Sequence, residues 1–174
     1  MKIRVLILLA LLVGIGTVLH AVIPGFSIMG VKPDLLLSMM FLGIFLFPKA
    51  QYVLLLSLAS GIIAALTTSA AGGQIANIID KPIAAFIVLA LFLLIRNKVN
   101  SNITAPVLTF IGTVISGAVF AGIIALIASL PEGGYLALIV TAVLPAAAVN
   151  TVIMVVVYPI VQSIMKRTNL ASAI

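Results

Sequence analysis

A cluster of polar side chains stands out in a chain that is otherwise almost entirely apolar. Within residues 72–82, Gln74, Asn77 and either Asp80 or Lys81 follow one another at spacings of three or four. In a helix, these spacings place side chains on one face. Amide and charged groups are costly to bury at membrane depth unless they pair or bind something. The stretch therefore predicts a ligand-binding face at the mouth of a helix.

A carboxylate and a lysine flanked by amides would suit a zwitterionic ligand such as an amino acid. Asp80 and Lys81 are neighbours in the sequence. Because neighbouring side chains on a helix point in different directions, we expect that they do not simply neutralise each other. Lys32 and Asp34, from the preceding loop, could pair with them. The alternative is that all these charges form interhelical salt bridges that hold outer loops on the bundle.

Three further groups have both a functional and a structural interpretation. Met39 and Met40 could line a pocket for a flat ring or merely fill a gap in the core. Asn150 lies deep in an apolar run and could hydrogen-bond a substrate, or could join two helices. His20 is interpreted as a hydrogen-bonded residue near the membrane surface rather than as a proton relay.

The composition indicates one polytopic membrane domain over residues 1–174. The chain is 64% hydrophobic and 7% charged, and its mean hydropathy is +1.46. A soluble domain needs far more polar surface. The chain has no Cys and one His, and it has no nucleotide-binding or catalytic motif. We therefore expect neither an enzyme nor a metal or cofactor site. Any use of ATP would depend on another chain.

Six apolar runs predict an all-α fold with six transmembrane helices. The first run is long enough to be a retained span rather than a cleaved signal peptide. Its small residues Ala10 and Gly14 lie on a stripe that lets another helix approach closely, within this bundle or from a partner. Pro145 and Pro159 should kink the long last run. The expected spans are about 3–23, 34–47, 52–70, 74–95, 105–130 and 135–165, with 96–104 as a loop.

The basic residues predict the orientation. If the N-terminus is inside, seven of the nine basic residues fall in cytoplasmic segments, and Lys32 and Lys81 fall outside. Cytoplasmic loops carry an excess of Lys and Arg, so both termini are expected in the cytoplasm. Single basic residues at the ends of apolar runs are explained by topology, and nucleic acid is not an expected partner. The seven are Lys2, Arg4, Lys49, Arg96, Lys98, Lys166 and Arg167.

Two charged motifs and two later segments resemble one known family. The motifs are Gly-Val-Lys-Pro-Asp-Leu-Leu-Leu-Ser-Met-Met-Phe at 30–41 and Gly-Gln-Ile-Ala-Asn-Ile-Ile-Asp-Lys-Pro at 73–82. The segments are Leu-Pro-Ala-Ala-Ala-Val-Asn at 144–150 and Tyr-Pro-Ile-Val-Gln at 158–162. Together they resemble the tryptophan-specific S component of energy-coupling-factor (ECF) transporters, over nearly the whole chain.

The resemblance implies a multi-pass protein of the cell membrane that captures L-tryptophan from outside. Its implied partners are a transmembrane coupling (T) subunit and two cytoplasmic ATPase subunits. The family docks its coupling subunit through a small-xxx-small pair on the first helix, a position that Ala10 and Gly14 fit, with Gly in place of the more usual second Ala.

Within this resemblance, charge suggests a role for each polar residue. Asp80 would hold the substrate ammonium, and Lys81 or Lys32 the carboxylate. Met39 and Met40 would contact the indole ring. Gln74, Asn77 and Asn150 would orient the substrate.

Three other functions remain open at this stage. The first is an S component for another vitamin or aromatic metabolite. The second is a self-sufficient ion-coupled carrier, although no inverted repeat is evident. The third is a structural or assembly protein whose outer charges only hold loops in place.

Overall fold

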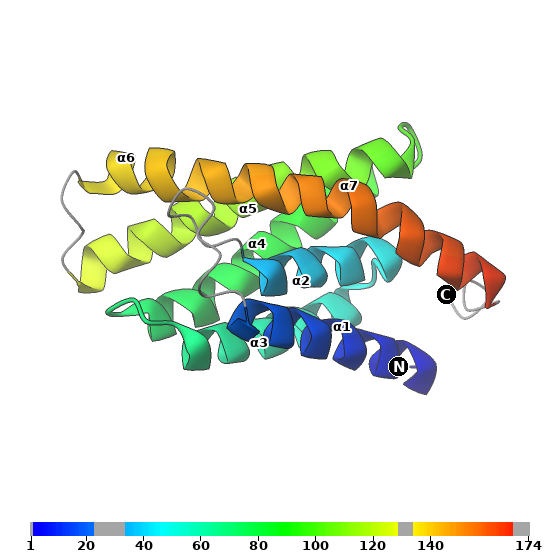
Figure 1. Ribbon diagram of the computed structural model, residues 1–174, viewed down its shortest axis with the longest axis horizontal. Coiled ribbons are helices and arrows are strands. Elements are labelled where there is room, and N and C mark those ends of the chain that lie inside the picture. Colours follow the sequence, from blue (N-terminus) through cyan, green and yellow to red (C-terminus); the bar gives the residue numbers. More distant parts are fainter. Residues whose placement is uncertain (1, 23–33, 129–133, 169–174) are drawn as a thin grey trace.

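The structure is a computed structural model that describes residues 2–22, 34–128 and 134–168, and Lys32 lies outside this range. None of the described residues forms a strand. The elements are α1 (Ile3–Val22), α2 (Leu35–Leu46), α3 (Ala50–Thr67), α4 (Gly73–Ile95), α5 (Ser101–Ile127), α6 (Gly134–Leu138), the π-helical turn η1 (Ile139–Val143) and α7 (Leu144–Arg167). Figure 1 shows them as one elongated bundle.

The described residues contain five helical segments that are long and apolar enough to cross a membrane, with α6, η1 and α7 counted as one. The prediction of an all-helical membrane fold is therefore confirmed. The second predicted span, about 34–47, corresponds to α2, which has only 12 residues and is too short to cross a membrane as a helix. At 1.5 Å per residue it is about 18 Å long, less than the roughly 30 Å hydrocarbon core of a bilayer.

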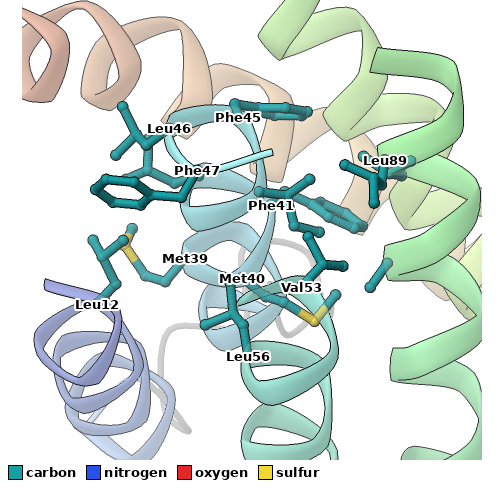
Figure 2. Close-up of a cluster of buried hydrophobic side chains, with 14 of the residues drawn as sticks. Leu12, Met39, Met40, Phe41, Phe45, Leu46, Phe47, Val53, Leu56 and Leu89 are labelled. Carbon is teal, nitrogen blue, oxygen red and sulfur yellow. The ribbon is translucent and has the colours of Figure 1, made fainter. Parts of the chain in front are cut away.

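Helix α2 forms the centre of the bundle. It contacts α1, α3, α4, α5 and α7, and each of its 12 residues is buried. This explains why its sequence is apolar on every side rather than amphipathic. Figure 2 shows Phe41, Phe45 and Met40 of α2 packed among side chains of the neighbouring helices. The Phe45 ring centroid lies 5.1 Å from that of Phe92 on α4.

Two helix ends differ from the sequence prediction for local reasons. Helix α5 begins at Ser101, inside the predicted loop 96–104, because the Asn100 side chain accepts a hydrogen bond from the Asn102 amide at 3.0 Å and caps the helix. Helix α3 ends at Thr67, before the predicted limit of residue 70. The turn that follows is completed by Gly72, whose φ of 74° is in the left-handed region that favours glycine.

The two ends of the bundle differ in charge. The start of α1, the α2–α3 and α4–α5 connections and the end of α7 lie together at one end in Figure 1. These elements carry all seven basic residues assigned to the cytoplasm, from Lys2 to Arg167. The α3–α4 turn and the end of α5 lie at the opposite end. These seven basic residues therefore lie at the end of the bundle away from the α3–α4 turn.

The burial of α2 predicts a contrast between two phenylalanines. Phe41 on α2 is fully buried, whereas Phe86 on α4 is 38% exposed. Phe41→Ala should lower the free energy of unfolding by about 3–5 kcal/mol, because it leaves a cavity in a packed core. Phe86→Ala should cost far less. Unfolding in detergent measures both variants, and equal losses would contradict a core centred on α2.

Candidate functional site

A cavity of about 350 Å³ lies beyond the N-terminal end of α2. It exists because α2 is short while its neighbours α3, α4 and α5 continue past it. Its polar lining residues come from α1, α3, α4 and α5, from the N-cap of α2 and from the α3–α4 turn, and they are His20, Asp34, Thr67, Thr68, Ser69, Asn77, Asp80, Lys81, Thr113 and Ser116. A cavity with a few convergent polar groups in an apolar protein is the usual form of a small-molecule site.

The Lys81 ammonium joins the polar groups of the cavity. Its Nζ lies 3.2 Å from Asp34 Oδ2 and 3.1 Å from Asp80 Oδ2, and it donates to Asn77 Oδ1 at 3.2 Å. A lysine has three N–H donors, and here each has an acceptor. Lys81 is 2% exposed and Asp80 is fully buried. These charges are therefore desolvated and depend on one another.

The Asp80 carboxylate has one occupied oxygen and one free oxygen. Oδ2 accepts from Lys81 and also from the Ser116 hydroxyl, 2.5 Å away on α5. Oδ1 is buried and has no hydrogen-bond partner among the described residues. A buried carboxylate oxygen without a donor is costly. Asp80 lines the cavity, so this oxygen is a candidate acceptor for a donor group bound there.

Asp34 connects the cluster to two other helices. Its Oδ1 accepts from the Leu37 amide at 2.9 Å, so that Asp34 is the N-cap of α2. The same oxygen lies 3.7 Å from His20 Nδ1 on α1. The partial positive charge of a helix N-terminus favours a carboxylate at this position. Asp34 is therefore held by α1, α2 and α4 together.

Among the described residues, the formal charges of this cluster do not balance. With both carboxyl groups ionised and His20 neutral, Asp34, Asp80 and Lys81 sum to one net negative charge. A ligand ammonium would restore neutrality in this buried site. The remaining lining residues are apolar, and they are Leu37, Ala64, Ala70, Gly117, Phe120, Ala142, Val143 and Ala146.

Comparison with known proteins identifies the family. Residues 2–166 match the family described as tryptophan transporter TrpP. The chain is 50% identical over 173 residues to the "Probable tryptophan transport protein" of Bacillus subtilis, covering 99% of each chain. A protein with the same description from Clostridium acetobutylicum is 32% identical over 166 residues, which is 95% of this chain and 96% of that one. The chain belongs to the TrpP family.

A third relative, from Clostridium perfringens and with the same description, is 33% identical over 170 residues and 92% of each chain. The names of these three relatives describe transport rather than catalysis. TrpP family membership and the long apolar helices make the chain a multi-pass protein of the cell membrane. No solved structure matches it significantly.

The structure brings together Asp34, Asn77, Asp80 and Lys81, four of the residues that spacing and charge predicted for the site. One detail of that prediction is wrong, because Lys81 does pair with its neighbour Asp80. The long, flexible lysine side chain lets Nζ reach back to a carboxylate that lies about 100° away around the helix.

Other predicted residues lie outside the cavity lining. Gln74 is exposed in the first turn of α4, so sharing a helix face with Lys81 does not bury it. Met39 and Met40 are buried in the hydrophobic core instead (Figure 2). Asn150 is buried behind the cavity, where its Nδ2 donates to Thr113 Oγ1 at 3.3 Å. Lys32 lies outside the described residues.

The predicted docking pair lies elsewhere in the molecule. Ala10 and Gly14 line a second, apolar hollow of about 580 Å³ between α1 and α3. A Cβ added at Gly14 would meet no atom within 4 Å. Among the described residues, no other helix packs against Gly14. The interpretation that the small residues of α1 pack only within this bundle is therefore wrong at Gly14.

Sequence reasoning missed Ser116 and Thr113 as cavity residues. The Ser116 hydroxyl donates to Asp80 Oδ2, and Thr113 Oγ1 accepts from Asn150 Nδ2. The signal that could have found both is their spacing. Two hydroxyls three residues apart in an apolar run share one helix face.

The linkage through Lys81 makes a testable prediction for stability. Lys81→Met should lower the free energy of unfolding by about 3–5 kcal/mol, because it leaves buried carboxylates without their cation. Lys98→Met changes an exposed lysine and serves as the matched control, with little expected effect. Unfolding in detergent compares the two variants. Similar stabilities would show that Lys81 does not hold the cluster.

Proposed function

We propose that this chain binds L-tryptophan in the cavity and is the substrate-binding S component of an ATP-driven ECF importer. The observation that carries the proposal is the surplus carboxylate at the cavity, with the free Oδ1 of Asp80. This arrangement suits an ammonium group, and the relatives of the TrpP family are named as tryptophan transport proteins. An apolar wall beside the charged cluster suits the rest of an aromatic amino acid.

The roles of the residues follow from their contacts. Asp80 binds the substrate ammonium through Oδ1. The three N–H donors of Lys81 are directed to Asp34, Asp80 and Asn77. Lys81 therefore positions the two carboxylates and has no donor left for the substrate. The substrate carboxylate then requires another donor, and Lys32, two residues before Asp34 in the sequence, is the proposed partner.

The proposed orientation has the cavity facing outward and both termini in the cytoplasm. The elements that carry the seven basic residues lie at one end of the bundle, and the α3–α4 turn beside the cavity lies at the other (Figure 1). An excess of Lys and Arg favours the cytoplasmic side. The short α2 would count as the sixth membrane element.

Transport in this proposal requires partners, namely a transmembrane coupling subunit and two ATPase subunits. The apolar hollow at Ala10 and Gly14 is the proposed docking site for the coupling subunit. Small residues let a helix of a second chain approach closely. The described cavity lies apart from this hollow, since the two share no lining residue.

The binding role of Asp80 can be tested directly. Tryptophan in hundredfold excess over Kd should stabilise the purified protein by about 2.7 kcal/mol, and leucine should not. Asp80→Asn should weaken binding by about 2–5 kcal/mol, roughly 30-fold or more in Kd, because the buried ammonium loses its charged partner. Thermal shift and calorimetric titration measure both effects.

Gln74→Ala, a change at an exposed residue of the same helix, is the matched control and should bind tryptophan normally. Unchanged affinity in Asp80→Asn would contradict the proposed ammonium site. If no amino acid stabilised the unaltered protein, tryptophan would be withdrawn as the ligand in favour of vitamins or other aromatic metabolites.

The proposed docking role of α1 can be tested by comparing substitutions at two glycines, Gly14 on α1 and Gly122 on α5. A Cβ added at Gly14 or at Gly122 meets nothing within 4 Å, so leucine at either position should leave the fold intact. Gly14→Leu should abolish tryptophan uptake in cells while the purified variant still binds tryptophan, because the added side chain blocks the coupling subunit. Gly122→Leu should keep both.

Equal uptake by the two glycine variants would argue against docking at this hollow. Accumulation of tryptophan by the isolated protein in vesicles with an ion gradient would favour a self-sufficient carrier instead.

A further inference from the structure

One face of α5 changes from polar to apolar along the cavity. Thr113, Ser116, Gly117 and Phe120 all line it, and their spacings of three, one and three place them on a single helical face. Thr113 and Ser116 supply hydroxyls, while Gly117 and Phe120 supply apolar surface. At 1.5 Å per residue, this face covers about 10 Å. An amino acid with an aromatic side chain has the same order of groups along its length.

The polar half of this face is tied to the charged cluster. Ser116 donates to Asp80 Oδ2 at 2.5 Å, and the next residue, Gly117, already belongs to the apolar half. The proposed ammonium site and the apolar wall therefore meet within one turn of α5. A ligand held at Asp80 would extend its side chain toward Phe120.

The wall opposite Gly117 is built by the π-helical turn. Ala142 and Val143 of η1 line the cavity together with Ala146, one turn further on. The Leu144 amide donates to the Ile139 carbonyl, the i to i+5 bond of a π-helix. Pro145 has no amide to offer the Thr141 carbonyl, and its ring would crowd that carbonyl in a regular α-helix. The wider turn before the proline accommodates this conflict, and such turns often occur at functional sites.

The two walls are in close contact at one point. A Cβ added to Gly117 would lie 2.5 Å from Val143 Cγ1 and 2.6 Å from Cγ2. Val143 therefore approaches the α5 backbone as closely as glycine allows. The space beside Gly117 is therefore occupied by Val143, and Phe120, Ala142 and Ala146 line the cavity together with these two residues.

We propose that the wall formed by Gly117, Phe120, Ala142, Val143 and Ala146 is the subsite for the aromatic ring of the substrate, and that the π-helical turn sets its size limit. This inference rests on the proposed function, since it assigns the ring position within the same cavity. Its ligand class is a flat bicyclic ring with no charge. Val143 is the residue that determines ring-size selectivity.

The test compares ring-methylated tryptophans with tryptophan itself. Calorimetric titration gives the ratio of the two Kd values for the unaltered protein and for Val143→Ala, which opens the wall. One methyl group in a hydrophobic pocket is worth about tenfold or more in discrimination. For at least one methyl position, Val143→Ala should therefore reduce the discrimination by about tenfold. The ratio is insensitive to a general loss of stability, because both ligands would be affected equally.

Val140→Ala is the matched control, since Val140 belongs to the same π-helical turn and is 60% exposed. It should leave every ratio unchanged. Ala146→Leu works in the opposite direction and should weaken tryptophan binding more than phenylalanine binding, which gives a second readout if Val143→Ala folds poorly.

Ratios that are the same in the unaltered protein, Val143→Ala and Ala146→Leu would overturn the ring subsite, while normal tryptophan binding left the proposed function standing. Absence of tryptophan binding to the unaltered protein would instead overturn the proposed function, and the subsite with it.

Discussion

The structure depends on one buried ammonium group. Lys81 on α4 lies within 3.2 Å of acceptors on Asp34, Asp80 and Asn77, and two of these acceptors would be uncompensated charges without it. Inside an apolar bundle, a buried charged side chain has little access to water, so its favourable partners are other groups of the protein or a ligand. Because Asp34 caps α2 and Asp80 bonds to Ser116 on α5, this single cation fixes the positions of three helices around the cavity.

The short α2 is the second constraint. Its 12 buried residues fill the centre of one half of the bundle, and its end leaves the other half open for a cavity. Asp34, the N-cap of this helix, also belongs to the charged cluster. It therefore lies at the boundary between the packed core and the cavity. The same carboxylate lies near His20 of α1, the helix that carries the Ala10 and Gly14 surface. A change in the cluster on ligand binding would therefore act on the helix proposed to dock the coupling subunit.

The cavity combines an electrostatic site with an apolar one, and they place different demands on the fold. The charged side uses desolvated groups in fixed pairs, which give orientation and discriminate by charge. The apolar side uses small residues, a phenylalanine and a π-helical turn, which discriminate by shape. One face of α5 contributes to both sides of the cavity, because Ser116 belongs to the charged side and the next residue, Gly117, to the apolar side. This division suits a binding protein that must recognise both the backbone and the ring of an amino acid.

The sequence by itself predicted an all-helical membrane protein, and it made Asp34, Asn77, Asp80 and Lys81 conspicuous because hydrocarbon excludes unpaired polar groups; these four residues line one cavity. Only the tertiary structure decided which of them meet. Gln74 shares a helix face with Lys81 but lies in an exposed first turn, and Met39 and Met40 pack in the core because α2 is surrounded on every side. The spacing of Thr113 and Ser116 indicates a shared helix face, but their partners Asn150 and Asp80 lie more than 30 residues away in the chain and were decided by the tertiary structure. The local sequence indicates which segments are helical and which faces are buried. A binding site, however, depends on how separate helices are placed relative to one another.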